Sequence, residues 1–285
     1  MGRLNDRLNS ICRKVSRLFG TTEISQRRIR KFLDTVSIVE PLRSEIPPVS
    51  VAVVIPCYGH SSFLVSTLES IANQSRHPDE VIAIDDCSPD QSSEVLEKEL
   101  ARLRERGNIR CTLLKNDRNR GQAFTLNRGI AAAGSELIMI LNDDDYLMHD
   151  AVATQFELFE RYTEAVMIGG TSIHFCGNEE LELHPKTGRS IPGVEKVALS
   201  VSLPSDVRSF RHYNDLNMTH SGCCFLKSVW EKVGGYYSEK NKRLVPFSDR
   251  DFQLRVNALF PVAVSNDVPF SFWRSDSSVD QGRDS

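Results

Sequence analysis

Short apolar runs alternate with helical repeats through most of the chain. Four runs of six to eight mainly apolar residues lie at 49–56, 80–86, 109–115 and 136–141, as is typical of buried strands. The segments between them repeat apolar residues every three or four positions, which predicts helices. Alternation of this kind predicts an α/β fold, in which a mostly parallel sheet is covered by helices on both faces. The three helices are expected at 63–73, 88–103 and 121–134.

The pattern is less regular in the last part of the chain. A strand is expected at 165–175, followed by a polar, turn-rich stretch and a further apolar segment at 220–226. A short helix is predicted at 227–233. Another helix is expected to begin after Ser248, which we interpret as its N-cap, with Asp251 three residues later.

The first part of the chain is basic and amphipathic. Apolar residues recur at helical spacing through 4–18, with Arg and Lys between them, and a second basic cluster lies at 27–31. Two interpretations of residues 1–45 stay open. In the first, these residues form helices that pack on the main domain or mediate self-association. In the second, they attach to an anionic membrane surface, which would place the protein peripherally at the inner face of the membrane. The expected parts are a helical extension at 1–48, one main domain at 49–273 and a flexible tail at 274–285.

Composition and cysteine usage exclude several classes of protein. With 285 residues, of which 40% are hydrophobic and 26% charged, the chain has the composition of a soluble protein with one large core. No apolar run approaches the roughly 20 residues that a membrane helix needs, and the first residues lack the apolar core of a signal peptide. The seven cysteines form no CxxC pair, so we expect neither disulfides nor zinc, and a cytoplasmic location.

The net charge of −3 hides an uneven distribution. Residues 1–48 carry ten Lys and Arg against five Asp and Glu, whereas the remainder carries 25 against 33. The two parts therefore have net charges of +5 and −8. The acidic main part argues against nucleic acid as a partner, because phosphate backbones are bound by basic surfaces.

Carboxylates gather where two of the predicted strands end. Asp85 and Asp86 close the second strand, and Asp143, Asp144 and Asp145 follow the fourth. In open parallel sheets the ligand crevice lies outside the carboxyl ends of the strands. Adjacent ionised carboxylates repel one another, and a divalent cation relieves that repulsion. Because oxygen ligands select Mg²⁺ or Mn²⁺, which complete their coordination with substrate phosphate and water, the pattern indicates a metal-bound diphosphate as ligand.

Other uses of such carboxylates do not fit the sequence. The chain has no GxxxxGK[ST] loop, which argues against a P-loop nucleotidase. The cluster also lacks the alternating ligands, the glycine and the distal Glu of an EF-hand. A phosphotransferase of the haloacid dehalogenase type would carry DxDxT after its first strand, whereas this cluster follows the fourth.

Four segments resemble, in this order, the successive motifs of the family 2 glycosyltransferases. They are VSVAVVIPCYGHSSFLVSTLESIANQS at 49–75, DEVIAIDDCSPDQSSEVL at 79–96, NRGQAFTLNRGIAAAGSELIMILNDDDYL at 119–147 and VGGYYSEKNKRLVPFSDRDFQLRV at 233–256. The resemblance covers residues 49–273 and implies the GT-A fold, a Rossmann-like α/β architecture. It also implies an inverting, metal-dependent enzyme that moves a sugar from a nucleotide-sugar donor, expected to be UDP-linked, to a hydroxyl acceptor in glycan or cell-surface polysaccharide synthesis.

The donor-site residues of the family are matched at the ends of the first two predicted strands. Pro56 and Tyr58 correspond to the residues that flank the nucleotide base, with the tyrosine ring as a stacking face. Asp86 corresponds to the carboxylate that hydrogen-bonds the base, usually uracil. Asp85 is the alternative for this role, and we favour Asp86.

The metal motif of the family is matched at 142–144 with one departure. By this resemblance Asp143 lies near the ribose, and Asp144 is the direct ligand of Mn²⁺ or Mg²⁺. Asn142 stands where the family usually has its first Asp, and a neutral amide predicts a weaker cation site. We expect Asp145 to fix the following turn rather than to bind metal.

The start of the last predicted helix carries the candidate catalytic base. Asp249 matches the carboxylate that takes the proton of the acceptor hydroxyl while the metal stabilises the departing nucleoside diphosphate. Carboxylates at a helix start also act as caps, and we assign that role to Asp251. Further candidates, each with a plain structural alternative, are Arg118 and Arg120 for a diphosphate, His220 for an acceptor or metal contact, and Trp273 for a sugar ring.

The sequence leaves the acceptor open among a glycan, a lipid-linked acceptor, a peptide and a small molecule. It also leaves an alternative to an enzyme, which is a catalytically degenerate GT-A-like module for sugar-nucleotide binding or assembly. Asn142 is the feature that supports this alternative. Turnover separates the two hypotheses, because a degenerate module binds nucleotide without releasing it from a donor.

Overall fold

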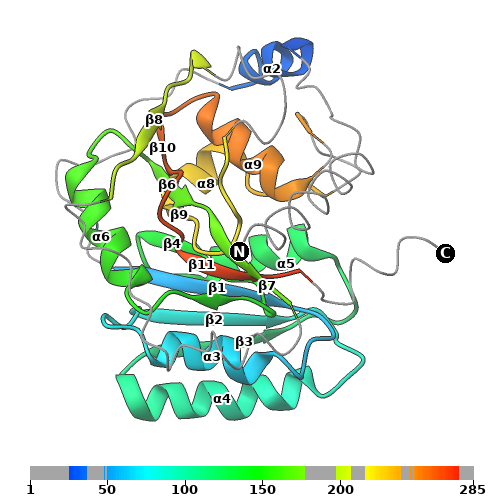
Figure 1. The fold of residues 1–285 in the computed structure, drawn as a ribbon. Helices are drawn as coiled ribbons and strands as arrows, with labels where there is room; N and C mark the ends of the chain where they lie inside the picture. Colours follow the sequence, from blue (N-terminus) through cyan, green and yellow to red (C-terminus); the bar gives the residue numbers. More distant parts are fainter. Residues whose placement is uncertain are drawn as a thin grey trace, which may run out of the picture.

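The computed structural model describes residues 26–36, 48, 50–176, 197–206, 216–238, 244–245 and 247–275. The first amphipathic stretch and nearly all of the expected tail lie outside these ranges. The described residues fold around one eight-stranded sheet with a three-stranded sheet beside it (Figure 1).

The first half of the main domain builds the parallel part of the large sheet. Its strands are β1 (Val51–Cys57), β2 (Glu80–Asp85), β3 (Arg110–Lys115) and β4 (Leu137–Ile140), and its helices are α3 (Leu64–Ala72), α4 (Ser92–Gly107) and α5 (Gln122–Ala132). β1 pairs in parallel with β2 and β4, and β2 pairs in parallel with β3. Helices α3 and α4 lie on one face of these strands and α5 on the other (Figure 1). Every residue of β1, β2 and β4 is buried, because both faces of these strands are covered.

The second half adds strands of mixed direction. They are β6 (Met167–Gly170), β8 (Ser200–Ser202), β9 (Cys224–Leu226) and β10 (Val262–Ser265), with helices α6 (Ala151–Arg161), α8 (Lys227–Val233) and α9 (Ser248–Asn257). β9 is antiparallel to β4 and β6, whereas β10 is parallel to β6 and antiparallel to β8. The strand order is β3-β2-β1-β4-β9-β6-β10-β8. The predicted α/β class with a mostly parallel sheet is confirmed.

The single strand predicted at 165–175 is two strands that belong to different sheets. β6 lies in the large sheet, while β7 (Ser172–Phe175) pairs in parallel with β11 (Ser271–Arg274), which also pairs antiparallel with β5 (Tyr146–Leu147). The chain leaves the large sheet after Gly170, where an added Cβ would lie 2.9 Å from the Phe270 ring and 3.0 Å from the carbonyl oxygen of Ser265. This close approach requires glycine, and the change of sheet interrupts a run that is continuous in the sequence.

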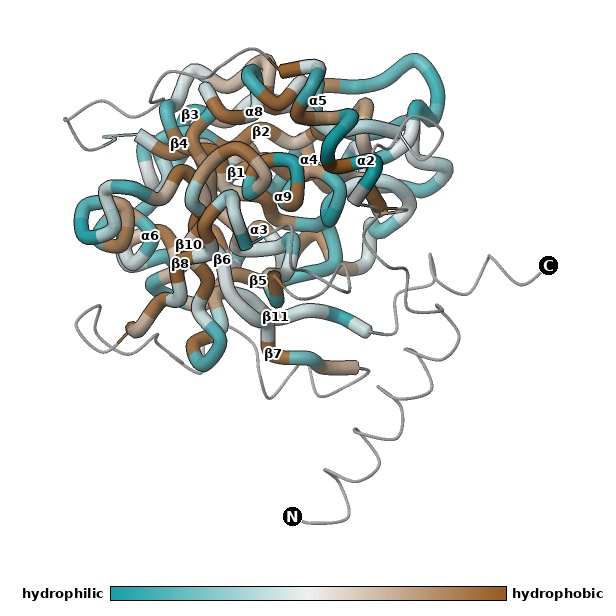
Figure 2. Tube along the Cα trace, turned by 90° about the horizontal axis from the view of Figure 1, so that it is seen from above, coloured by the Kyte–Doolittle hydropathy of each residue, from teal (hydrophilic) through white to brown (hydrophobic). Residues whose placement is uncertain are grey.

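The apolar core follows the strands of the large sheet. Hydrophobic residues line the central strands, and hydrophilic residues are concentrated on the outer helices and loops (Figure 2). The buried residues of α3, α4, α5 and α6 pack against these strands. The core thus gives a rigid support to the loops that follow the strands.

The described part of the N-terminal extension is helix α2 (Gln26–Leu33), which packs on α9. Ile29 and Phe32 are buried in a small apolar cluster with Leu244, Leu254 and Ala258. The basic residues of this helix, at 27, 28, 30 and 31, are exposed. In the described part of the chain, no helix combines the length and the apolar character needed to cross a bilayer.

Candidate functional site

The carboxyl ends of β1, β2 and β4 meet at one edge of the sheet. β1 lies between β2 and β4, and its Cys57 pairs with Asp85. The backbone N–H of Asp86 donates to the Cys57 carbonyl oxygen at 2.8 Å. The N–H of Tyr58 donates to Asp143 Oδ2 at 3.0 Å. The structure thus brings together predicted site residues from three strand ends.

Asp143 has a second partner that the sequence analysis did not single out. His60, in the turn between β1 and α3, is 7% exposed, and its Nδ1 lies 2.9 Å from Asp143 Oδ1. Burial opposes the charged form of this imidazole. The hydrogen bond with Asp143 and the charges of Asp143 and Asp144 outweigh that effect and raise the pKa of His60. Its place in the CYGHSS turn, two residues after Tyr58, was the available signal.

His60, Asp143 and Asp144 form a buried cluster that can hold a cation. Each residue offers one ligand atom, and these atoms lie within 4.8 Å of one another. Two buried side-chain atoms in this region, His60 Nε2 and Asn142 Oδ1, lack a hydrogen-bond partner among the described residues. Carboxylate oxygens, an amide oxygen and an imidazole nitrogen are suitable donors for Mn²⁺, and the oxygens alone suit Mg²⁺. The residues present therefore fit a divalent metal ion.

Asp145 is tied into the fold rather than into this cluster. It is fully buried and accepts from Ser221 Oγ at 2.5 Å, from the Arg274 N–H at 3.0 Å and from Asn142 Nδ2 at 3.2 Å. Burial and the charge of Asp144 raise its pKa to about 8. These contacts join the end of β4 to β11 and to the segment before β9. They agree with a role in fixing the turn.

Asp86 lies among hydrogen-bond donors of the loop that precedes α5. Its carboxylate is 3% exposed and accepts from Asn116 Nδ2 at 2.6 Å and from the N–H groups of Arg120 and Gly121, both at 2.8 Å. A carboxylate has about four acceptor positions, so one stays available for a ligand donor. Asn116 is oriented in turn by Arg128, whose Nη1 donates to Asn116 Oδ1 at 2.6 Å. Sequence reasoning missed both of these supporting residues.

The other predicted donor-site residues differ in exposure. Tyr58 is 41% exposed, so its ring is accessible for stacking. Pro56 is buried within β1, where it can shape the strand end but presents no free surface. Asp85, the alternative to Asp86, is buried and accepts from the N–H of Ser88 at 2.9 Å, which fixes the turn after β2.

Asp249 lies in the first turn of α9 and outside the metal cluster. It is half-buried and close enough to His220 for its charge to act on that imidazole. Burial lowers the pKa of His220, and the charge of Asp249 opposes this shift. His220 Nε2 lies 3.1 Å from the Tyr236 hydroxyl. The adjacent Ser221 donates to Asp145, so one segment connects the surroundings of Asp249 with the end of β4.

The predicted capping pair at the start of this helix is wrong. Phe247 holds the N-cap position without a side-chain hydrogen bond, and Ser248 Oγ donates to the Tyr237 carbonyl oxygen at 2.8 Å. Asp251 is fully buried and accepts from the N–H of Leu244 and from Arg255 Nε at 2.7 Å. The buried guanidinium of Arg255 needs a carboxylate partner, so the Asp251 side chain binds Arg255 instead of capping the N–H groups at the helix start.

The remaining candidates lie at the margins of the site. The Arg120 guanidinium lies over the Phe124 ring, 4.4 Å from its centre, and Arg118 is exposed. Trp273 is 36% exposed on β11, where its ring meets the His174 ring edge-on at 4.4 Å between centres. No bond in the described part of the chain joins these residues to the metal cluster.

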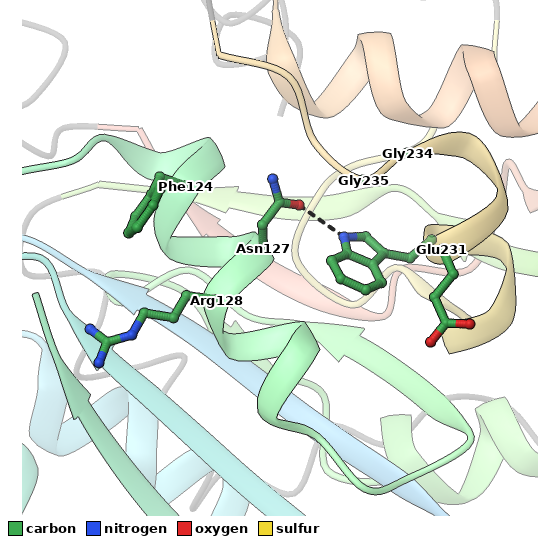
Figure 3. A pocket seen from close by; sticks show the side chains of 7 residues that line it. Phe124, Asn127, Arg128, Glu231, Gly234 and Gly235 are labelled. Atoms are coloured by element: carbon green, nitrogen blue, oxygen red, sulfur yellow. Dashed lines mark hydrogen bonds between the residues drawn. The ribbon is translucent and has the colours of Figure 1, made fainter.

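A separate pocket of about 620 Å³ lies between α5 and α8 (Figure 3). Asn127 Oδ1 accepts from Trp230 Nε1 at 2.8 Å across it, so its wall is held by a hydrogen bond (Figure 3). None of the predicted site residues lines this pocket. The lining residues are Phe124, Asn127, Arg128, Trp230, Glu231, Gly234 and Gly235.

Comparison with known proteins identifies the family of the main domain. The family model "Glycosyl transferase family 2" matches residues 52–233. The chain belongs to this family. Two relatives of this family 2 glycosyltransferase illustrate the similarity. The succinoglycan biosynthesis protein ExoO of Rhizobium meliloti is 30% identical over 193 residues, which are 67% of this chain and 50% of ExoO. The glycosyltransferase GlyG of Streptococcus pneumoniae is 29% identical over 119 residues, 42% of this chain and 38% of GlyG.

Two solved structures share the fold of this chain. The Staphylococcus aureus TarS fragment 1–349 in complex with UDP aligns with a TM-score of 0.57 at 16% identity, covering 79% of this chain and 60% of that one. The mannosyltransferase PcManGT of Pyrobaculum calidifontis, in complex with GDP-Man and Mn²⁺, aligns with a TM-score of 0.57 at 17% identity, covering 87% and 63%. The predicted family and the GT-A fold are confirmed. This chain spans about half or less of the lengths of the two curated relatives, GlyG and ExoO.

Proposed function

We propose that this protein is an inverting, metal-dependent glycosyltransferase that uses a nucleotide-sugar donor, expected to be UDP-linked. The observation that carries the proposal is the meeting of Asp86, Tyr58, Asp143 and Asp144 at one sheet edge within a family 2 domain. The complexes of TarS with UDP and of PcManGT with GDP-Man and Mn²⁺ support a donor of this class.

The donor is held, in this proposal, by its base and its diphosphate. Asp86 accepts the N3–H of a uracil at its remaining acceptor position, and the exposed ring of Tyr58 stacks on the base. Asp143, fixed by the Tyr58 N–H, lies near the ribose. Asp144 holds the cation with its carboxylate. When bound, the cation offsets the charge of the diphosphate and so stabilises the leaving nucleoside diphosphate.

Asp249 acts as the general base in the proposed reaction. Its carboxylate takes the proton of the acceptor hydroxyl as the oxygen attacks the anomeric carbon, and the bond to the diphosphate breaks on the opposite side. This single displacement inverts the configuration of the sugar. The assignment is supported by the half-buried position of Asp249 at the start of α9, since Asp251 in the same turn is committed to Arg255.

The acceptor is proposed to be a hydroxyl group of a growing glycan or cell-surface polysaccharide. ExoO supports this class, because it is named as a protein of succinoglycan biosynthesis. The exposed basic residues of α2 support peripheral contact of the extension with an anionic membrane from the cytoplasmic side. Packing of Ile29 and Phe32 on α9 favours a contact made by charge rather than by insertion of the apolar face of α2.

The decisive experiment measures release of nucleoside diphosphate. The protein is incubated with a panel of sugar nucleotides and Mn²⁺ or Mg²⁺, with and without hydroxyl acceptors, and free UDP or GDP is scored. Activity with at least one donor, loss of that activity in Asp249→Asn, and unchanged UDP affinity in this variant are expected. Asp267→Asn, at an exposed carboxylate near β10, serves as the matched control.

A degenerate binding module gives a different result in the same experiment. Such a protein binds nucleotide but releases none from any donor, and Asp249→Asn changes nothing. That outcome would remove the enzymatic proposal and leave the binding function.

A further inference from the structure

The imidazole of His60 is buried beside the acidic motif, and only one of its two nitrogens has a hydrogen-bond partner among the described residues. It is 7% exposed, and its Nδ1 lies 2.9 Å from Asp143 Oδ1. Its other nitrogen, Nε2, is buried and lacks a hydrogen-bond partner among the described residues. His60, Asp143 and Asp144 place their ligand atoms within 4.8 Å of one another.

No protonation state of His60 satisfies both ring nitrogens with the described protein groups. If Nδ1–H donates to Asp143, the Nε2 lone pair stays buried without a donor. If Nε2 carries the proton, that N–H lacks an acceptor, and two lone pairs face each other between Nδ1 and the carboxylate. A doubly protonated ring still leaves the Nε2–H without an acceptor. Buried polar atoms without a protein partner are rare in folded proteins, and an ordered water or a bound ion satisfies them.

The distance between the imidazole and the carboxylate also fits a shared cation. Two ligands at neighbouring corners of an octahedron with bonds of about 2.1 Å are about 3.0 Å apart. The observed separation of 2.9 Å between Nδ1 and Oδ1 is close to that value, and it is also an ordinary length for an N–H···O hydrogen bond. Alternatively, Nδ1–H donated to a carboxylate leaves Nε2 as the ligand, which is the common arrangement around a metal-bound histidine. Either arrangement leaves one ring nitrogen able to coordinate a cation.

We propose that His60 supplies a nitrogen ligand to the divalent cation and thereby makes the site selective for Mn²⁺ over Mg²⁺. Imidazole suits first-row transition metals, whereas Mg²⁺ prefers oxygen ligands and water. The substitution at Asn142 removes a carboxylate from the motif, and the nitrogen of His60 adds a donor without adding negative charge. This inference rests on the proposed metal-dependent donor site and specifies its cation.

The test detects the nitrogen directly. Mn²⁺ is bound to the full chain in the presence of UDP, and electron spin echo spectroscopy records the coupling between Mn²⁺ and a directly bound ¹⁴N. We expect this coupling in the unmodified protein and its loss in His60→Gln. The measurement on the unmodified chain needs no variant, so it holds even if His60→Gln folds poorly.

The affinity measurement gives an independent readout. In Mn²⁺ titrations with Mg²⁺ as competitor, His60→Gln is expected to weaken Mn²⁺ binding about tenfold or more and Mg²⁺ binding less than about threefold. His77→Gln, at the other end of α3, is the matched control, since its Nε2 lies 3.2 Å from the Ala72 carbonyl oxygen and outside the metal cluster. It should leave both affinities unchanged.

The outcomes separate the two proposals. Bound Mn²⁺ without ¹⁴N coupling, or an unchanged Mn²⁺ to Mg²⁺ ratio in His60→Gln, overturns the role of His60 and leaves metal-dependent transfer standing. Failure of either cation to bind in the presence of UDP would overturn the metal-dependent mechanism as well.

Discussion

The position of Asp86 is predicted to depend on a pair of residues that do not touch the donor. Asn116 Nδ2 donates to Asp86 Oδ1 at 2.6 Å and to Thr125 Oγ1 at 3.0 Å, while its Oδ1 accepts from Arg128 Nη1 at 2.6 Å. Arg128 is itself held by the carbonyl oxygen of Lys115 at 2.6 Å. The guanidinium thus fixes which end of the amide faces the carboxylate. Removing either residue should loosen the group that recognises the base.

The size of the effect follows from the bonds involved. A hydrogen bond to a charged group contributes about 1.5–3 kcal/mol, and Asp86 keeps its two backbone donors when Asn116 is truncated. We therefore expect Asn116→Ala to weaken UDP binding by about 1–2 kcal/mol, or roughly five- to thirtyfold in Kd. Arg128→Met keeps the amide and removes its orienting partner, so a loss of about 1 kcal/mol, roughly fivefold, is expected.

Calorimetric titration with UDP and CDP measures both the loss and its cause. Uracil offers an N3–H to Asp86, whereas the N3 of cytosine is an acceptor, so the variants should lose affinity for UDP and little for CDP. Arg106→Met, at the exposed end of α4, is the matched control, and thermal unfolding checks that each variant is folded. A folded Asn116→Ala protein that binds UDP within about twofold of the parent would refute this reasoning.

Four further outcomes follow from single contacts. Asp144→Ala should abolish the dependence of UDP binding on Mn²⁺ or Mg²⁺, measured by titration with and without chelator, and unchanged metal dependence would remove Asp144 from its role. Asp251→Ala should cost about 3–5 kcal/mol of unfolding free energy in urea, because a fully buried guanidinium loses its carboxylate, and a loss below about 1 kcal/mol would contradict this. Burial raises the pKa of Asp90, but hydrogen bonds from hydroxyl and N–H groups outweigh it and hold the pKa at about 2, below the ordinary 3.8. Its stabilising contribution is therefore present above about pH 4 and is lost as pH falls towards 2, so Asp90→Asn should show a shallower acid unfolding curve in that window, and superimposable curves would disprove it. Ile29→Ala and Phe32→Ala should each cost about 2–5 kcal/mol and expose α2 to limited proteolysis, and an unchanged digestion pattern would show that this helix does not depend on its packing.

The alternation of strands and helices was predictable because buried parallel strands leave an unambiguous apolar signal. Strands β6 and β7 were not distinguished, since only Thr171 lies between them in the sequence and the close packing at Gly170 that accompanies the change of sheet is a tertiary contact. The sequence pattern also did not predict that Ile29 shares an apolar cluster with Leu254. Helical spacing shows that a face is apolar, but it does not show which distant segment covers that face.

The candidate site was predictable to the extent that its residues follow strand ends. Asp86, Asp143 and Asp144 stand next to apolar runs, so topology alone brings them to one edge. His60 lies in the turn between β1 and α3, where no strand or helix periodicity indicates the position of its side chain. A single histidine in a sequence is usually structural, so nothing marked it as a site residue. The error at Asp251 has a similar cause. Its partner Arg255 lies four residues further along the same helix, and in a sequence this spacing is typical of an ordinary surface ion pair, whereas the structure buries both side chains.

The amide at position 142 has a structural reason that is independent of any loss of catalysis. Asn142 Nδ2 donates to Asp145 Oδ2 at 3.2 Å, and Asp145 is fully buried with hydrogen bonds from Ser221 and from the backbone of Arg274. A carboxylate in place of this amide would supply no donor to Asp145 and would add repulsion against its ionised form, which burial and the charge of Asp144 already disfavour, as the raised pKa of Asp145 shows. An amide at this point supplies a donor and removes that repulsion. Asn142 is therefore weaker support for a catalytically degenerate module than the sequence alone suggests. The substitution Asn142→Asp is expected to destabilise the fold rather than to strengthen the metal site.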